Sequence, residues 1–230
     1  MAAAAEQPLA IVIPAFQAAA TLAAVIAGAR QAAPRARIVV VDDGSTDGTG
    51  AAGEGVVLLR FPRNRGKGAA LAAGVGDALA AGAGWIVTLD ADGQHPASEI
   101  PRLLVPLAAG VADLVLGARR RAGAMPLSRR TTNWLSSLLA SRVAGAPVPD
   151  AQTGFRAFRR GVAERVRPGE TRYDYELAFL LGALAAGFRA AAVEVPTVYE
   201  GRPSHFRALA DTWRMARVFG RYGGRILRGA

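Results

Sequence analysis

Short apolar runs alternate with longer, alanine-rich segments along the first half of the chain. Apolar runs of this length are typical of buried strands, whereas the alanine-rich segments have helical composition. The predicted strands are Leu9–Pro14, Ile38–Asp42, Val56–Arg60, Trp85–Asp90 and Ala112–Ala118, and the predicted helices are Ala18–Ala33, Thr46–Gly53, Gly68–Ala81 and Ser98–Ala109. This alternation predicts an α/β fold in which helices flank a mostly parallel central sheet.

The pattern changes after residue 118, where an arginine-rich loop runs from Arg119 to Arg130. The elements predicted beyond it are a helix at Thr131–Val143, a strand at Gly154–Phe158, a helix at Tyr175–Ala186, a strand at Ala190–Val195 and a basic C-terminal helix. We find no internal repeat and no linker inside this pattern. We therefore predict one domain over residues 1–230, divided into a first half (1–118), a second half (119–205) and the C-terminal helix (206–230).

Composition narrows the class of protein. The 230 residues are 51% hydrophobic, which is ample for one buried core. The sequence contains no cysteine, which excludes a disulfide, a thiolate metal site and a cysteine nucleophile. The N-terminal residues lack the layout of a signal peptide, and no uncharged apolar stretch reaches the ~18 residues that a spanning helix requires. We expect a cytoplasmic protein without a membrane-spanning helix.

The formal net charge of +10 is unevenly distributed. Acidic residues slightly outnumber basic ones over residues 1–100, whereas basic residues outnumber acidic ones more than twofold over residues 101–230. All basic residues but one are arginine. A genomic composition bias explains the choice of arginine over lysine as well as a functional reason does, but it does not explain the difference in charge between the two halves. We expect the second half to face an anionic partner.

Acidic residues end two of the predicted strands, and ligands of parallel α/β sheets bind at the carboxyl ends of strands. Asp90-Ala91-Asp92-Gly93-Gln94 directly follows the apolar run Trp85–Leu89. Two carboxylates and an amide oxygen suit Mg²⁺ or Mn²⁺, which takes its remaining ligands from water and from substrate phosphates. An Asp-x-Asp is common on protein surfaces, but its place at a strand end favours a metal site that stabilises a leaving nucleoside diphosphate.

Two further motifs precede it. In Val39–Asp47, Thr46 or Asp47 can cap a helix and Gly44 can make a turn, but Asp43 is left free to accept hydrogen bonds from a base or ribose. In Arg63–Gly68, backbone amides at a helix N-terminus favour a phosphate. The spacing there matches neither a P-loop nor a dinucleotide fingerprint.

Six motifs occur in order along nearly the whole chain: Ile11–Phe16, Val41–Asp47, Asn64–Gly68, Asp90–Gln94, Gly117–Arg119 and Gln152–Arg156. Together they resemble the family 2 glycosyltransferases of the GT-A fold, and within them the polyprenyl-phosphate sugar synthases typified by dolichyl-phosphate mannose synthase. The resemblance implies that the first half binds a nucleotide sugar and that the second half binds the acceptor. Two departures are Gln17-Ala18, where relatives often carry an acid, and Ser204-His205-Phe206, where many carry Ser-Lys.

The resemblance assigns roles to individual residues. The expected nucleotide-sugar site comprises Pro14, Phe16, Val41, Asp43, Lys67, Asp90, Ala91 and Asp92, and the metal ligands are Asp90, Asp92 and Gln94. The expected catalytic residues are Asp92, Arg119 and Asp150, and the candidates for acceptor or phosphate binding are Arg119, Arg129, Arg130, Arg156, Arg202 and His205. Arginine suits the latter role because a guanidinium makes bidentate contacts with phosphate.

Two acceptors fit this sequence. The leading hypothesis is metal-dependent transfer of a hexose, with inversion, from a GDP-mannose or UDP-glucose type donor to a polyprenyl phosphate, whose oxygen is already an anionic nucleophile. The alternative is a soluble glycan or small-molecule hydroxyl, for which Asp150 would serve as base. A nonenzymatic nucleotide-binding or nucleic-acid-binding module is a third reading, but no nucleic-acid motif appears and we expect no nucleic-acid partner.

The C-terminal segment bears on the choice of acceptor. Phe206, Leu209, Trp213 and Ala216 recur at helical spacing, with arginines on a neighbouring face. Such a basic amphipathic helix is typical of proteins that lie on an anionic membrane surface, although a helix docked on the core with a solvated arginine face fits the same pattern. We expect peripheral association with the inner face of the cell membrane.

Overall fold

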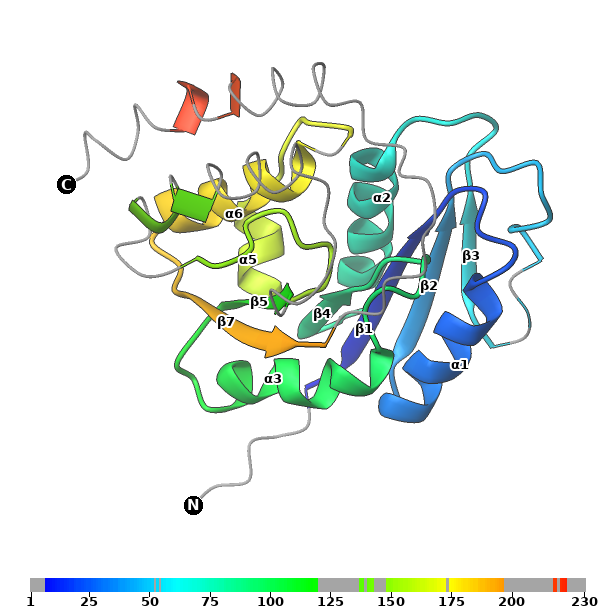
Figure 1. The fold of residues 1–230 in the computed structure, drawn as a ribbon, viewed down its shortest axis with the longest axis horizontal. Helices are drawn as coiled ribbons and strands as arrows, with labels where there is room; N and C mark the ends of the chain where they lie inside the picture. Colours follow the sequence, from blue (N-terminus) through cyan, green and yellow to red (C-terminus); the bar gives the residue numbers. More distant parts are fainter. Residues whose placement is uncertain are drawn as a thin grey trace.

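The computed structural model describes residues 7–51, 53, 55–119, 137–138, 140–142, 148–172, 174–196, 217–218 and 220–222. Its centre is a seven-stranded sheet in the order β3-β2-β1-β4-β6-β5-β7 (Figure 1). The strands are β1 (Leu9–Ala15), β2 (Arg37–Asp42), β3 (Val57–Arg60), β4 (Trp85–Thr88), β5 (Leu114–Arg119), β6 (Arg156–Arg159) and β7 (Ala190–Val195). Only β6 runs antiparallel to its neighbours, β4 and β5. The prediction of a mostly parallel sheet flanked by helices is confirmed.

Helices cover both faces of the sheet (Figure 1). Helices α2 (Lys67–Ala80), α5 (Arg160–Arg165) and α6 (Tyr175–Ala185) lie on one face, and α1 (Leu22–Ala32), the 3₁₀ turn η1 (Ala97–Glu99) and α3 (Ile100–Ala108) lie on the other. A hydrophobic core lies on each face of the sheet. Strand β1 contributes side chains to both cores, because successive side chains of a strand point to opposite faces. Val12 packs with α2, whereas Ile11 and Ile13 pack with α1. This two-sided burial explains the uninterrupted apolar runs of the sequence.

The predicted strands and most of the helices agree with the structure to within a few residues. The helix predicted at Thr46–Gly53 is wrong, because its described residues form bends and turns. Their polar side chains bind another loop: Asp47 Oδ2 accepts a hydrogen bond from Ala19 N at 3.0 Å, and Thr49 Oγ1 accepts one from Ala18 N at 2.8 Å. These residues therefore satisfy amides just before α1 and do not begin a helix of their own. Helix α5 was not predicted.

Several predicted elements lie wholly or partly outside the described residues. They are most of the arginine-rich loop Arg119–Arg130, much of the helix Thr131–Val143 and most of the C-terminal basic helix. Ser137, Leu138 and 140–142 are helical, as are 217–218 and 220–222. Within the portion of the chain that is described, no helix is long and apolar enough to cross a membrane.

Candidate active site

The carboxyl ends of the parallel strands meet at one edge of the sheet, and the predicted acids lie there. In the register of β1 and β2, Pro14 pairs with Val41 and Ala15 pairs with Asp42. Strand β4 lies on the other side of β1, and Leu89 N continues the pairing with a 3.0 Å hydrogen bond to Val12 O. Asp90 follows at once. The edge therefore carries the residues that the sequence assigned to the nucleotide sugar and the metal.

Asp90 is held by a lysine. The Nζ of Lys67, at the start of α2, lies 2.7 Å from Asp90 Oδ1 and 2.6 Å from Glu176 Oε1 on α6. Burial alone would lower the pKa of Lys67, but the two carboxylates outweigh it and raise that pKa above its usual value. Burial would likewise raise the pKa of Asp90, yet the Lys67 ammonium keeps it below its usual value. Both groups are therefore charged at neutral pH.

Asp92 and Gln94 complete the predicted metal set. Asp92 is exposed, and its Oδ1 accepts a 3.0 Å hydrogen bond from Gln94 N. Its pKa is raised, because surrounding protein partly removes it from water and the negative charge of Asp90 lies nearby. Two carboxylates and an amide oxygen fit a hard divalent cation that also binds substrate oxygens. No cluster of three or more acidic or histidine residues suited to a metal occurs within the described ranges.

Gly154 lies directly against the Asp90 carboxylate. A Cβ added at this position would overlap both carboxylate oxygens. The glycine is held in place by its carbonyl oxygen, which accepts a 2.7 Å hydrogen bond from Thr88 Oγ1 on β4. A glycine is therefore required here because a larger residue would displace the acid.

Arg119 and Asp150, both predicted to be catalytic, form an ion pair with each other. Arg119 ends β5, and its Nε and Nη2 donate to the two Asp150 oxygens at 2.7 and 3.2 Å. Asp150 is 2% exposed. Both carboxylate oxygens of the candidate base are thus engaged by a guanidinium. The pair lies close enough to His95 to influence its pKa, and the charge of Arg119 also helps to lower the pKa of Asp90.

Asp43 does not have the free carboxylate that the sequence suggested. Its Oδ1 accepts a hydrogen bond from Arg65 N at 2.7 Å, and its Oδ2 accepts one from Gly66 N at 2.9 Å. Ala69 N, in the first turn of α2, donates to Thr171 O at 3.1 Å. Two of the loop amides predicted to cradle a phosphate, those of Arg65 and Gly66, are therefore taken up by the protein itself. This narrows our interpretation of the Arg63–Gly68 loop, since these two amides are not available to a phosphate.

The remaining nucleotide-site candidates line the same edge. Pro14 and Val41 are buried side by side, and Ala91 is 5% exposed. Phe16 is 37% exposed just beyond the end of β1. An exposed aromatic ring at a strand end is suited to packing against a planar base.

Arg156 corrects another prediction. It is 2% exposed, and its guanidinium donates to the carbonyl oxygens of Thr153, Glu176 and Ala151 at 2.8, 2.5 and 2.9 Å. These contacts join β6 to the start of α6 and leave Arg156 unsuited to binding an acceptor phosphate. The other acceptor candidates, Arg129, Arg130, Arg202 and His205, lie outside the described residues.

Sequence reasoning missed two residues at the site. Glu176 is 4% exposed, and burial raises its pKa although Lys67 opposes the shift. Its signal was an acid at the start of an otherwise apolar helical segment. His95 follows Gln94 and is 5% exposed, with its ring centroid 5.5 Å from that of Phe155. Burial lowers its pKa, and its Nδ1 has no hydrogen-bond partner among the described residues.

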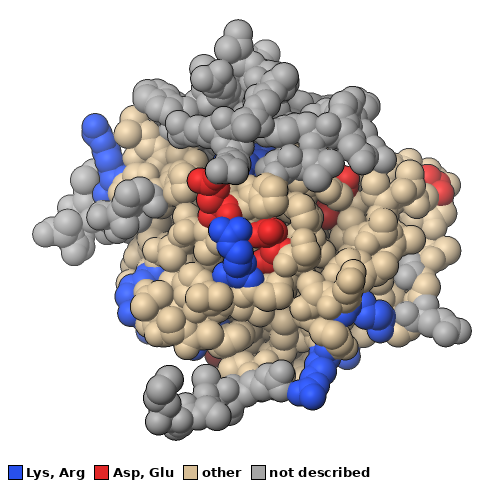
Figure 2. All heavy atoms as spheres, turned by 60° about the horizontal axis from the view of Figure 1, so that its bottom comes forward, with Lys and Arg blue, Asp and Glu red and all other residues tan. Residues whose placement is uncertain are grey.

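Several of the described arginines form ion pairs with acidic side chains. Figure 2 shows acidic and basic side chains lying together on one face, with other basic side chains near its rim. Arg159 and Arg189 both pair with Asp113, at 3.6 and 3.4 Å, and Arg160 pairs with Glu164 at 2.7 Å. At these positions acids therefore offset part of the positive excess of the second half, although Arg159 and Arg189 share the one carboxylate of Asp113.

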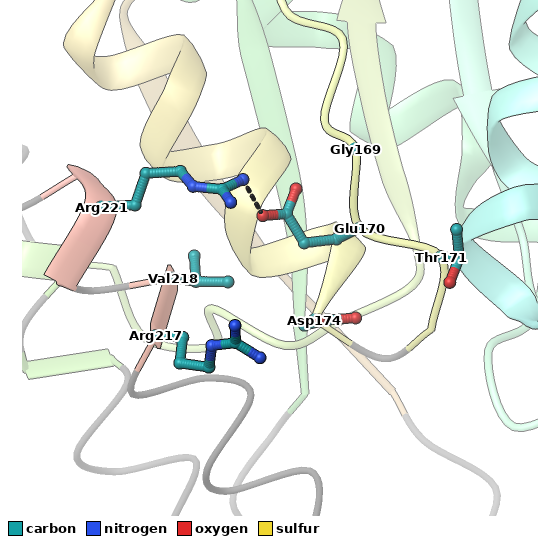
Figure 3. Close-up of a pocket in the computed structure, with 7 residues that line it drawn as sticks. All are labelled: Gly169, Glu170, Thr171, Asp174, Arg217, Val218 and Arg221. Atoms are coloured by element: carbon teal, nitrogen blue, oxygen red, sulfur yellow. Dashed lines mark hydrogen bonds and ion pairs between the residues drawn. The ribbon is translucent and has the colours of Figure 1, made fainter.

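A cavity of about 330 Å³ lies beside the N-terminal end of α6 (Figure 3). It is lined by Gly169, Glu170, Thr171, Asp174, Arg217, Val218 and Arg221. Arg221 points toward Glu170, and its Nη1 lies 2.8 Å from Glu170 Oε1. Because acids and arginines share this lining, the cavity is less suited to an anionic phosphate than a purely basic site would be.

The sheet order and the strand-end acids define the class of protein: the chain has the GT-A fold of nucleotide-sugar transferases. Its structure is similar to a crystal structure of glucosyl-3-phosphoglycerate synthase from Mycobacterium tuberculosis in complex with Mn²⁺, UDP and glucosyl-3-phosphoglycerate. The TM-score is 0.73 with 22% sequence identity, over 95% of this chain and 81% of that chain. At this identity the likeness shows the fold alone.

The sequence model of the family "Glycosyl transferase family 2" matches residues 10–167 of the chain. The chain therefore belongs to this family. It is therefore a glycosyltransferase. It is 31% identical to the polyprenol monophosphomannose synthase of Mycolicibacterium smegmatis, over 84% of this chain and 77% of that protein. It is 35% identical to the undecaprenyl-phosphate mannosyltransferase of Micrococcus luteus, over 64% of this chain and 65% of that protein. The predicted resemblance to the polyprenyl-phosphate transferase group is confirmed.

Proposed function

We propose that this protein transfers a hexose from a nucleoside-diphosphate sugar of the GDP-mannose or UDP-glucose type to a polyprenyl phosphate, with Mg²⁺ or Mn²⁺ as cofactor. The observation that carries the proposal is the meeting of Asp90, Lys67 and Arg119 at the carboxyl ends of β4 and β5. The names of the two mannosyl-transferring relatives support the acceptor class. The Mn²⁺ and UDP in the similar crystal structure support the donor class and the metal.

The donor half of the site follows from the strand ends. Asp90, Asp92 and Gln94 would hold the metal, and the exposed ring of Phe16 would pack against the base beside Pro14. When bound, the divalent cation would neutralise the negative charge that develops on the leaving nucleoside diphosphate. The chain's own contribution is to fix these oxygens at the sheet edge, since Asp90 is confined by Gly154 and Lys67.

The acceptor half requires positioning more than base catalysis. A phosphate oxygen is already anionic at neutral pH, so the protein needs cations to orient it and to offset its charge. Arg119 lies at the edge of the site and is held by Asp150 through both of its oxygens. We infer that Asp150 orients Arg119 toward the acceptor. A soluble hydroxyl acceptor would instead need Asp150 to leave this ion pair and take a proton.

The assay that tests this function uses purified protein, Mn²⁺, and GDP-mannose and UDP-glucose in parallel. Undecaprenyl phosphate in detergent is the acceptor, and the matched control is the corresponding polyprenol, which lacks the phosphate. We expect release of a nucleoside diphosphate with the phosphate only. No turnover with either donor on any polyprenyl phosphate would refute the lipid acceptor. Turnover on a soluble glycan that is lost in Asp150→Asn, with donor binding intact, would favour the alternative.

We further propose that the protein acts at the inner face of the cell membrane as a peripheral protein. The support is the pattern of the C-terminal basic helix in the sequence and the lipid acceptor itself. Sedimentation with vesicles that contain an anionic lipid should exceed sedimentation with neutral vesicles, and the difference should decrease with salt. Equal sedimentation with both kinds of vesicle would contradict this location.

A further inference from the structure

Lys67 is the only lysine among the 28 Lys and Arg residues of the chain. The composition favours arginine at every other basic position, so the lysine at the start of α2 calls for a physical reason. An ammonium is a compact charge on a flexible stem, whereas the planar fork of a guanidinium is organised for one bidentate geometry. A lysine is therefore the better residue where a cation has to move between two partners.

Two neighbours crowd the Asp90 carboxylate, whose side chain is 23% exposed. Its Oδ1 is 2.7 Å from Lys67 Nζ, and the backbone of Gly154 lies so close that a Cβ there would overlap both oxygens. A divalent cation that binds the Oδ1 of Asp90 would have to share or displace the contact that the ammonium now makes. Lys67 and the metal are thus competitors for the same carboxylate.

Glu176 provides a second partner for the ammonium. Its Oε1 is 2.6 Å from Lys67 Nζ, and the residue is 4% exposed. The beginnings of α2 and α6 are packed tightly, because a Cβ at Gly68 would lie 2.6 Å from Tyr175 Cβ. The backbones of Lys67 and Glu176 are therefore held close together, within reach of a flexible lysine side chain. An ammonium that leaves Asp90 stays paired, and the high cost of an isolated buried charge is avoided.

We propose that Lys67 is a resident cation that neutralises Asp90 while the site holds no metal and is retained by Glu176 when a metal binds. This inference rests on the proposed metal site at Asp90 and Asp92. Competition with Lys67 weakens the binding of a bare metal ion, so that the metal binds well only together with a nucleoside diphosphate, whose oxygens supply further ligands. Lys67 is a positioning residue that couples metal binding to donor binding.

The unmodified protein allows a direct test, because [¹⁵N]lysine labelling gives one side-chain Nζ signal. Titration with Mg²⁺ in the presence of UDP or GDP should shift this signal. The reason is that the ammonium leaves Asp90, stays paired with Glu176 and comes to lie near the bound metal ion. Mn²⁺ binding is measured in parallel by electron paramagnetic resonance. Mn²⁺ binding that Asp90→Asn abolishes, with no change in the Lys67 signal, would overturn the exchange and leave the metal site standing. No Mn²⁺ binding with either nucleotide would overturn the metal site itself.

Variants measure the competition through affinity for Mn²⁺ alone. Lys67→Met should bind Mn²⁺ about tenfold more tightly, equivalent to ~1.4 kcal/mol. Glu176→Gln should bind it more weakly, because Lys67 loses its second partner and stays on Asp90. In the double variant that combines Lys67→Met and Glu176→Gln, the effect of Glu176→Gln on Mn²⁺ affinity should largely disappear. If the two effects on affinity were additive instead, each would be a general electrostatic effect, and the proposal would be overturned.

The Arg160–Glu164 ion pair on α5 supplies matched controls. Arg160→Met and Glu164→Gln make the same charge changes elsewhere on the protein and should leave the Mn²⁺ affinity unchanged. Thermal unfolding shows which variants remain folded. If Glu176→Gln unfolds, the lysine signal of the unmodified protein still decides the proposal.

Discussion

Asp43 and Asp90 occupy equivalent places, each just beyond the carboxyl end of a parallel strand, but they are held in different ways. The two oxygens of Asp43 accept hydrogen bonds from backbone amides, those of Arg65 and Gly66. Asp90 is held by a side chain, the ammonium of Lys67, and its other neighbour is the bare backbone of Gly154. Backbone amides cannot leave without local unfolding, whereas an ammonium can be exchanged for another cation.

The difference separates a structural acid from a chemical one. Asp43 holds the loop before α2 through the amides of Arg65 and Gly66, and it thereby helps to position Lys67, the next residue. The negative charge of Asp90 is neutralised by Lys67 in this structure. We propose that a metal ion neutralises it during turnover. Replacing Asp43 should therefore affect stability, whereas replacing Asp90 should affect catalysis.

Asp90→Asn should have the largest effect. An amide retains the shape of the side chain but binds a divalent cation poorly, and we expect glycosyl transfer to fall roughly 10²- to 10³-fold. The midpoint of thermal unfolding should change little, because Glu176 still pairs with Lys67. Nucleoside diphosphate release and circular dichroism measure the two quantities. A folded variant with near-normal turnover would show that Asp90 is not a metal ligand.

Gly154→Ala should have the next largest effect. The added Cβ would overlap the Asp90 oxygens, and because these are the end of a flexible side chain, the acid moves and the fold adjusts. We expect turnover to fall roughly ten- to a hundredfold, since misplacement of a catalytic group by about 1 Å is costly.

The matched control for Gly154 is Gly161→Ala on α5, where an added Cβ meets nothing within 4 Å. This variant should keep full turnover and gain up to ~1 kcal/mol of stability, because alanine is the better helix residue. Equal losses of turnover in the two variants would contradict the confinement of Asp90.

Asp43→Asn should affect stability more than chemistry. One of the amides of Arg65 and Gly66 would lose its acceptor, and the loss should cost about 1–3 kcal/mol in the free energy of unfolding. Urea unfolding monitored by tryptophan fluorescence gives this quantity. Turnover at saturating donor should fall much less than in Asp90→Asn. If turnover collapsed while the unfolding free energy stayed constant, Asp43 would belong to the chemistry after all.

The sequence predicted the sheet well because apolar runs and helical segments alternate so regularly in the first half. It also placed Asp90, Asp92 and Gln94 at a strand end, since that placement depends only on local order. It failed for Thr46–Gly53, where Asp47, which we interpreted as a possible helix cap, binds the amide of Ala19, and Thr49 binds the amide of Ala18. Contacts between loops distant in the sequence leave no periodic signal.

The same limit explains the errors at the site. Arg156 looked like any other arginine of a basic half, and its burial against three backbone carbonyls follows only from the packing of β6 on α6. Lys67 and Glu176 are far apart in the sequence, and no spacing rule connects them. The ion pair between Arg119 and Asp150 likewise joined two residues that the sequence had given separate roles.

Asp113 supplies the smallest effect and a test of position, because it precedes β5 and lies at the opposite edge of the sheet from Asp90. Its Oδ2 accepts a 3.0 Å hydrogen bond from Arg189 N, and although burial opposes it, this bond and the charges of Arg189 and Arg159 lower its pKa. Its contribution is thus present above the unfolded pKa of ~3.9 and is lost as pH falls through the folded pKa. Asp113→Asn should cost less than ~1 kcal/mol at pH 7 after solvent screening, and urea unfolding at pH 7 and pH 3 should show the difference from the unmodified protein shrinking. Turnover should be unchanged, and a loss comparable to that of Asp90→Asn would mean that strand-end position does not select the chemical acid.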